Sequence, residues 1–274
     1  MKYKLIAIDM DGTLLNSQNI VSKKNSEALH KAKEQGLYVI LSTGRILTSA
    51  LYYGQAIELG DPIIACNGAI VSSGNGDNIL YDKSIEVEAS KELIKLAEEN
   101  HIYYHFYDRD TFYTREIKDD VVRFYDSYDD NLGDHKMNIE VLDDPVKFLD
   151  RKPSIYKFVF IDNDKEKLLD FRMKLSYING VEISSSWENN IEVMSSGISK
   201  GYGLKYLIDT LNIDKSQVVA IGDNENDIPM FKISGLSIAM GNGESTIKEN
   251  ADIVTDTNDE NGVAKAIEKH VLNI

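Results

Sequence analysis

Apolar and polar positions follow two different periods along the first third of the chain. Short apolar runs predict buried strands, and the longer stretches between them, with apolar residues at helical spacing, predict helices. In chain order these elements are strand Tyr3–Asp9, helix Ser22–Gln35, strand Leu37–Leu41, a helix ending near Leu59, and strand Ile63–Cys66. Ser22 is a suitable N-cap and Gly36 a suitable C′ residue for the first helix. Strands that alternate with helices predict right-handed crossovers and a parallel sheet.

The pattern changes after about residue 83. A helix over Ala89–Asn100 is followed by two aromatic runs, Ile102–Tyr107 and Thr111–Thr114, separated by a polar turn, which predicts a hairpin. The later elements of this part are strand Ile155–Ile161, helix Lys165–Ser176 and strand Val181–Ser185. This middle third therefore predicts an α+β insert with an antiparallel sheet.

The alternating pattern returns after Val193. Its elements are helix Lys200–Leu211, strand Gln217–Ile221, a helix starting near Pro229, strand Leu236–Ala239, the short strand Ile253-Val254 and helix Glu260–His270. We expect an α/β protein with a doubly wound, mostly parallel, Rossmann-like sheet. Residues 1–82 and 194–274 would form this core, and residues 83–193 an inserted second domain.

Composition narrows the function classes. The 274 residues carry 30 basic and 45 acidic side chains, a net charge of −15, which argues against general affinity for nucleic acid or an anionic membrane. No apolar stretch approaches the roughly 20 residues that span a bilayer, and Asp9 interrupts the N-terminal apolar run, so no signal peptide is expected. The single cysteine, Cys66, excludes an intrachain disulfide and fits a reducing, cytoplasmic location. Oligomeric state cannot be read from the sequence.

Polar or glycine-containing residues end four of the predicted strands. They are Asp9-Met10-Asp11, Thr43-Gly44-Arg45, Asn67-Gly68 and Gly222-Asp223, and Lys200 begins a nearby helix. The carboxyl ends of parallel strands are where α/β proteins bind ligands. If the strands are neighbours, all of these residues meet at one edge of the sheet.

That edge has the components of phosphoryl transfer. Asp9, Asp11 and Asp223 would repel one another unless a cation neutralised them, and Mg²⁺ is the hard, oxygen-preferring ion for such a site. Thr43 with a backbone amide, and Lys200 at a helix N-terminus, would donate to a phosphate. One aspartate can act as the nucleophile, and the second can protonate the leaving oxygen. The sequence therefore favours magnesium-assisted phosphoryl transfer.

Each component by itself has a simpler interpretation. Asp-x-Asp and Thr43-Gly44-Arg45 are typical of solvated turns, and Lys200 of a helix surface. Asn67-Gly68 is a strong hairpin signal. Asp227 suits the first turn of a helix because of the helix dipole. The combination, in this order and at the ends of strands and helices, favours the functional interpretation.

The motifs that carry a family resemblance are Asp9-Met-Asp-Gly-Thr-Leu-Leu15, Ser42-Thr-Gly-Arg45, Asn67-Gly68, Ser199-Lys-Gly201 and Gly222-Asp-Asn-Glu-Asn-Asp227. In this order they resemble the signature set of the haloacid dehalogenase-like hydrolases. Within that superfamily the chain resembles the Cof-type phosphatases with an α/β cap of type C2B, and among these a sugar phosphatase most closely. The resemblance covers essentially the whole length, including the position of the insert.

The resemblance implies a role for each residue. Asp9 would be the nucleophile and a magnesium ligand, and Asp11 the general acid and base that binds Mg²⁺ through its backbone carbonyl. Asp223 would be the remaining protein ligand of Mg²⁺, and Asp227 would support the metal site without binding the ion itself. The residues expected to hold the phosphoryl group are Met10 (through its amide), Thr43, Gly44, Lys200 and Asn226. The implied activity is magnesium-dependent hydrolysis of small phosphomonoesters, with sugar phosphates expected, through an aspartyl-phosphate.

The insert would be the cap that closes over the site and contacts the substrate. About half of its strand aromatics should be core, because alternate residues of a strand face opposite ways. His105 and Arg109 are candidate substrate contacts, and Trp187-Glu188 is expected in the hinge or in cap packing.

Two alternatives stay open at this point. A phosphomutase or phosphotransferase could use the same core and pass the phosphoryl group to a sugar. A phospho-accepting receiver domain shares the clustered aspartates, but it would be about half this length and would have no insert.

Overall fold

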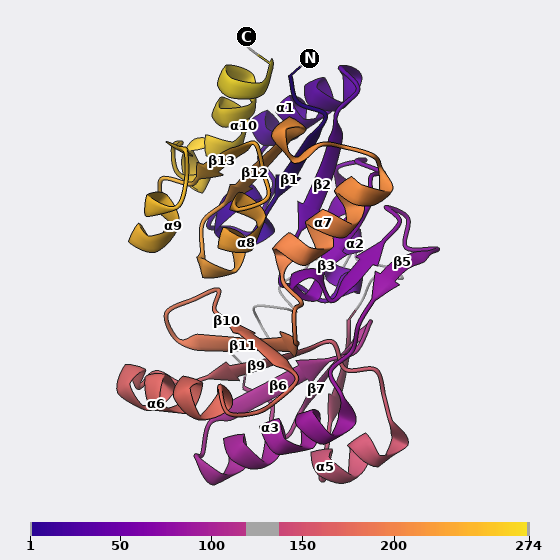
Figure 1. Cartoon of the computed structure of the whole chain (residues 1–274), viewed down its shortest axis with the longest axis vertical. Coiled ribbons are helices and arrows are strands. Elements are labelled where there is room, and N and C mark those ends of the chain that lie inside the picture. Colours follow the sequence, from indigo (N-terminus) through magenta and orange to yellow (C-terminus); the bar gives the residue numbers. More distant parts are fainter. Residues whose placement is uncertain (1, 119–136, 273–274) are drawn as a thin grey trace.

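The computed structural model describes residues 2–118 and 137–272. Its strands form two sheets, an eight-stranded one and a six-stranded one, which are called the core sheet and the cap sheet here. Figure 1 shows the two stacked along the long axis of the molecule, with both chain ends on the far side of the core sheet. Among the described residues, no helix combines the length and apolar character needed to cross a membrane.

The core sheet has the strand order β14-β13-β12-β1-β2-β3-β4-β5. The parallel strands are β1 (Leu5–Ile8), β2 (Tyr38–Ser42), β3 (Ile63–Ala65), β12 (Val218–Gly222), β13 (Leu236–Ala239) and β14 (Ile253–Val254). Two antiparallel strands, β4 (Ile70–Ser72) and β5 (Ile79–Asp82), continue the sheet beyond β3. The predicted mostly parallel, Rossmann-like sheet is confirmed, whereas β4 and β5 were not predicted.

Helices cover both faces of the core sheet because residues of β1 point alternately to each side. Ile6 and Ile8 belong to one hydrophobic cluster, with residues of α1 (Lys23–Glu34), α2 (Leu47–Ala56) and α10 (Gly262–Ile267). Leu5 and Ala7 belong to another, with residues of α7 (Lys200–Thr210), α8 (Ile228–Phe231) and α9 (Ser245–Glu249). The sheet is therefore doubly wound, as expected.

Individual residues explain where helix α1 begins and ends and where strand β3 turns into β4. Ser22 caps α1 by accepting a hydrogen bond from the amide of Asn25, and Gly36 beyond its C-terminus has φ of 86°. The turn at Cys66–Gly68 joins the antiparallel strands β3 and β4, so the hairpin predicted from Asn67-Gly68 is confirmed.

The cap sheet has the order β10-β11-β9-β6-β7-β8. Its strands are β6 (Tyr103–Tyr107), β7 (Thr111–Thr114), β8 (Asn138–Val141), β9 (Lys157–Ile161), β10 (Val181–Ser184) and β11 (Asn190–Ser195). All its pairings are antiparallel except β7 with β8. The predicted antiparallel sheet is present with that one difference, and β8 and β11 were not predicted. Strand β11 continues two residues past the expected end of the insert at residue 193.

Helices α3 (Val87–Glu99), α5 (Pro145–Phe148) and α6 (Lys165–Leu175) lie on the face of the cap sheet that is turned away from the core (Figure 1). Phe106, Phe158 and Phe160 pack on that side with residues of α3 and α6. The alternate positions, including Lys157 and Glu192, therefore face the core sheet. This opposite face of the cap sheet lines one side of a pocket between the two sheets.

Candidate active site

The ends of β1, β2 and β12 bring the predicted site residues to one edge of the core sheet. Ile8 pairs with Leu41 on one side and with Ile221 on the other. Asp9 and Asp223 therefore leave adjacent strands at nearly the same level, and the amide of Asp9 donates to the carbonyl of Ile221 at 3.0 Å. The sequence prediction that these strand ends meet is confirmed.

Three buried carboxylates form a cluster at this edge. Oxygen atoms of Asp9, Asp223 and Asp227 all lie within 4.8 Å of one another. The ammonium of Lys200, at the first position of α7, donates to Asp9 Oδ1 at 2.5 Å and to Asp227 Oδ1 at 2.7 Å. Among the described residues, this ammonium is the cation in ion-pair contact with the cluster, so negative charge exceeds positive charge there.

The excess of negative charge shifts the pKa values of the residues in the cluster. Burial and the nearby Asp227 carboxylate raise the pKa of Asp9 well above its usual range. The same two causes raise the pKa of Asp223 to about 7. Burial lowers the pKa of Lys200, but the carboxylates of Asp227 and Asp9 outweigh that effect and hold the pKa above its usual value. A buried set of carboxylate oxygens with excess negative charge suits a hard divalent cation such as Mg²⁺.

Two glycines allow the carboxylates to pack this closely. Gly12 has φ of +73°, and a Cβ there would lie 2.3 Å from Asp223 Oδ2. Thr13, the next residue, donates its hydroxyl to Asp223 Oδ1 at 2.8 Å. A Cβ on Gly222 would likewise lie 2.4 Å from Cγ of Asp227. The glycines of both motifs are thus required by the close approach of a carboxylate to the backbone.

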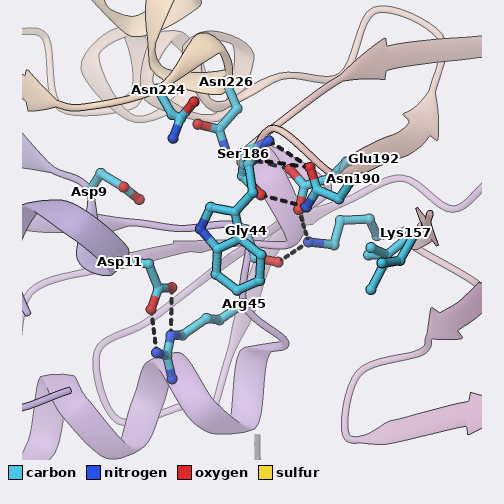
Figure 2. Close-up of a pocket in the computed structure, with 13 residues that line it drawn as sticks. Asp9, Asp11, Gly44, Arg45, Lys157, Ser186, Asn190, Glu192, Asn224 and Asn226 are labelled. Atoms are coloured by element: carbon cyan, nitrogen blue, oxygen red, sulfur yellow. Dashed lines mark hydrogen bonds and ion pairs between the residues drawn. The ribbon is translucent and has the colours of Figure 1, made fainter. Parts of the chain in front are cut away.

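The side chain of Asp11 lies outside the cluster, contrary to the grouping of Asp9, Asp11 and Asp223 expected from the strand ends alone. Arg45 donates from Nε to Asp11 Oδ2 at 2.7 Å, and from its second guanidinium nitrogen to Oδ1, so the pair is bidentate (Figure 2). The third clustered carboxylate is instead Asp227, which folds back to accept from the amides of Asp223 and Asn224 at 3.0 and 3.2 Å.

The loop after β2 lies beside this cluster. The hydroxyl of Thr43 accepts a hydrogen bond from the backbone amide of Arg45 at 3.1 Å. The backbone carbonyl of Thr43 accepts one from the backbone amide of Asn67 at 3.0 Å. The amide group of Asn226 donates to Asn67 Oδ1 at 3.3 Å. Oδ1 of Asn226 is buried without a hydrogen-bond partner among the described residues, so it has an acceptor available for a ligand.

A small pocket, with a cavity volume of about 50 Å³, lies between the two sheets (Figure 2). It is lined by Asp9, Asp11, Gly44, Arg45, Asn224 and Asn226 from the core, and by Lys157, Val159, Ile161, Ser186, Trp187, Asn190 and Glu192 from the cap side. Among the predicted site residues, Asp9, Asp11, Gly44 and Asn226 line this pocket. The others, Met10, Thr43, Lys200, Asp223 and Asp227, are buried around it without lining it.

None of the residues that line the pocket from the cap side was predicted as a substrate contact, and the two candidates, His105 and Arg109, are not among them. Lys157, Asn190 and Glu192 were missed, although a charged residue inside an apolar run, as in Ile191-Glu-Val-Met194, is a signal that could have found one of them. Trp187 was expected in the hinge or in cap packing and lines the pocket instead. His105, a candidate substrate contact, is fully buried and donates to or accepts from the hydroxyl of Tyr107 at 2.8 Å.

The model of one protein family, the haloacid dehalogenase-like hydrolases, matches residues 6–267. The chain is 33% identical over 272 residues to 5-amino-6-(5-phospho-D-ribitylamino)uracil phosphatase YcsE of Bacillus subtilis (strain 168). The aligned region covers 98% of this chain and 96% of that protein. The chain therefore belongs to the haloacid dehalogenase-like hydrolase family.

Solved structures agree with this assignment. A haloacid dehalogenase-like hydrolase from B. subtilis matches with a TM-score of 0.88 at 29% identity, over 99% of this chain and all of that one. The subclass IIB sugar phosphatase BT4131 matches with a TM-score of 0.82 at 25% identity, also over 99% of this chain and all of that one. The protein is a phosphatase of this family, and the receiver-domain alternative does not apply.

Proposed function

We propose that the protein hydrolyses small phosphomonoesters with Mg²⁺ and with Asp9 as the nucleophile. One observation carries this proposal. Asp9 is the member of the carboxylate cluster that also lines the pocket between the two sheets. A phosphoryl group in the pocket would therefore meet a carboxylate that is already held by Lys200 and close to a cation site.

The described side chains support a two-step reaction. A carboxylate oxygen of Asp9 attacks phosphorus, the bond from phosphorus to the leaving oxygen breaks, and Asp11 gives that oxygen a proton. Asp11 then takes a proton from a water molecule, whose oxygen attacks phosphorus. The bond from phosphorus to the Asp9 oxygen breaks, which releases inorganic phosphate and restores the Asp9 carboxylate. Asp11 lines the same pocket as Asp9, and Arg45 fixes the direction of its carboxylate.

The cluster accounts for the proposed metal requirement. Asp9 and Asp223, with the backbone carbonyl of Asp11, would hold Mg²⁺, and Asp227 would support them while it pairs with Lys200. Bound Mg²⁺ would neutralise charge on the phosphoryl oxygens. Met10 (through its amide), Thr43, Gly44 and Asn226 would contact those oxygens on the other side.

We further propose that residues 83–193 act as a cap between the two core segments 1–82 and 194–274, and that the cap selects the substrate. Ser186, Asn190 and Glu192 line the pocket with hydrogen-bonding groups (Figure 2), and Trp187 is a further lining residue. Such a lining suits a polyhydroxylated leaving group, which supports sugar phosphates as substrates.

A cytoplasmic location remains a prediction.

A substrate panel tests the proposal. Sugar phosphates, nucleotides and pyridoxal phosphate are incubated with the protein, with Mg²⁺ or with EDTA, and released phosphate is measured. We expect release from at least one compound with Mg²⁺, loss of release in EDTA, and loss in Asp9→Asn. An Asp9→Asn variant with wild-type turnover would show that the mechanism is wrong. Product analysis by NMR separates hydrolysis from the alternative, transfer of the phosphoryl group to a second sugar.

A further inference from the structure

A buried ion pair of the cap sheet lines the pocket but takes no part in the bond-making and bond-breaking steps described above. Lys157 in β9 and Glu192 in β11 lie on the face of the cap sheet that faces the core, with Nζ and Oε1 2.7 Å apart. Their side chains are only 2% and 4% exposed. Burial by itself would raise the pKa of Glu192, but Lys157, the hydrogen bond from Asn67 and the charge of Lys200 together outweigh burial and hold that pKa below its usual value.

Lys157 crosses from the cap to the loop that follows β2. Its ammonium donates to the carbonyl oxygen of Gly44. The nitrogen of the same peptide unit belongs to Arg45 and donates to the hydroxyl oxygen of Thr43 at 3.1 Å. This peptide unit is therefore held at both ends. Because the hydroxyl of Thr43 accepts from Arg45, its own proton is directed elsewhere and can be donated to a phosphoryl oxygen.

Glu192 holds the same loop from the other side. Its Oε2 accepts from the side-chain amide of Asn67 at 2.7 Å, and the backbone amide of Asn67 donates to the carbonyl of Thr43 at 3.0 Å. A second, longer contact of 3.4 Å joins Oε2 to the amide of Asn226. The ion pair is thus connected to both carbonyls that flank Gly44 and to Asn226.

Two features indicate that these contacts are closely fitted. A Cβ on Gly44 would lie 3.2 Å from Lys157 Nζ and 3.3 Å from Glu192 Oε1, so a larger residue at this position would require the pair to shift by a few tenths of an ångström. Cys66 and Asn67 have φ of 48° and 55°, a left-handed conformation that asparagine adopts more readily than most residues but that costs free energy at Cys66. Since buried ion pairs contribute little net stability, stability does not explain this arrangement.

We propose that Lys157 and Glu192 are positioning residues, which orient the Thr43–Gly44 loop for phosphoryl transfer only when the cap is seated on the core. The inference rests on the proposed function, because it assigns Thr43 to the phosphoryl group. In this arrangement a substrate that holds the cap closed also aligns the donor of its own phosphoryl group. Cap closure and alignment of the site are then one event.

The test is a double-mutant cycle between Lys157→Met and Thr43→Val. With the best substrate of the panel, Lys157→Met should lower kcat at least tenfold while KM changes less than threefold, because the alignment matters most in the transition state. In a Thr43→Val background the same substitution should lower kcat less than threefold further, since the hydroxyl of Thr43, the donor that Lys157 is proposed to align, is already removed. Full additivity of the two effects would overturn the proposal.

Two further variants separate positioning from folding. The double variant Lys157→Met/Glu192→Leu leaves no unpaired buried charge, and should match the wild type in urea unfolding while kcat stays at least tenfold low. Recovery of both stability and kcat would show that the pair only fills space. Lys33→Met, which breaks the Lys33–Asp61 pair of the core at 2.5 Å, is the matched control and should leave kcat unchanged.

Failures of the two proposals are distinguishable. A wild-type protein that releases no phosphate from any phosphomonoester would overturn the proposed function and the coupling together. An active wild type with an unimpaired Lys157→Met variant would overturn the coupling alone.

Discussion

Repulsion within the carboxylate cluster should lower the free energy of unfolding of the metal-free protein. The substitution Asp223→Asn should therefore raise that free energy. The substitution removes one negative charge from a buried site and keeps nearly the same side-chain shape. Its amide oxygen can still accept the hydrogen bond that Thr13 donates to Asp223 Oδ1 at 2.8 Å. The change therefore tests electrostatic repulsion and metal binding without opening a cavity.

The size of the effect follows from the pKa of Asp223, which burial and Asp227 raise to about 7 from 3.8. The folded protein binds this proton more tightly than the unfolded chain does, so the stability that the proton provides is full below about pH 4 and is lost as pH rises through about 7. At about 1.4 kcal/mol per pKa unit, the loss above pH 7 is at most about 4 kcal/mol. Because the folded protein relaxes, we expect Asp223→Asn to gain about 1–3 kcal/mol at pH 8.

Urea unfolding at pH 5 and pH 8, in EDTA and in Mg²⁺, measures these quantities. In EDTA the wild type should lose stability between pH 5 and pH 8, and Asp223→Asn should lose less and be the more stable protein at pH 8. Excess Mg²⁺ at 100 times its dissociation constant should stabilise the wild type by about 2.7 kcal/mol, and Asp223→Asn much less. Asp209→Asn, at an exposed carboxylate of α7, is the control and should behave as the wild type does.

Two results would refute the reasoning. One is an Asp223→Asn variant that is less stable than the wild type at pH 8 in EDTA, since the cluster would then not be repulsive. The other is equal stabilisation of both proteins by Mg²⁺, because Asp223 would then not hold the cation.

Three further substitutions test individual contacts. Lys200→Met leaves Asp9 and Asp227 without their ammonium and should cost about 3–5 kcal/mol in urea unfolding with EDTA; a loss under 1 kcal/mol would contradict the described pairing. Gly12→Ala places a Cβ 2.3 Å from Asp223 Oδ2 and should abolish stabilisation by Mg²⁺, whereas Gly36→Ala, at a similar φ with nothing within 4 Å, should keep it. Arg45→Met removes both hydrogen bonds to Asp11 and should lower kcat more than tenfold; an unchanged kcat would show that Asp11 needs no such support.

Much of the core side of the site could be predicted from the sequence, because its residues follow directly after buried strands. Asp9 and Asp223 end neighbouring strands, and the parallel arrangement alone brings them together. The direction of each side chain could not be predicted in this way. Asp11 turns to Arg45, and Asp227 takes its place in the cluster. Gly222 has no side chain and so leaves room for the Asp227 carboxylate, a contact that the strand pattern does not predict.

The cap side was less predictable for a different reason. Lys157 and Glu192 become neighbours only through the antiparallel pairing of β9 with β11, and β11 was not predicted. The strands β4, β5 and β8 were also missed, since runs of three or four residues carry too little periodicity to distinguish them from loops. A parallel pairing of β7 with β8 depends on the whole sheet rather than on either segment.

The central claim is that Asp9 carries the phosphoryl group, and intact-mass measurement of a quenched Asp11→Asn variant tests it most directly. Without the general base, attack of water on the aspartyl-phosphate should be slowed more than its formation. After mixing with substrate and Mg²⁺ and quenching in acid, the variant should gain the mass of one phosphoryl group, located on Asp9 by peptide mapping, and Asp9→Asn/Asp11→Asn should gain none. A phosphoryl group on another residue, or no mass gain in a variant that still turns over, would contradict the account.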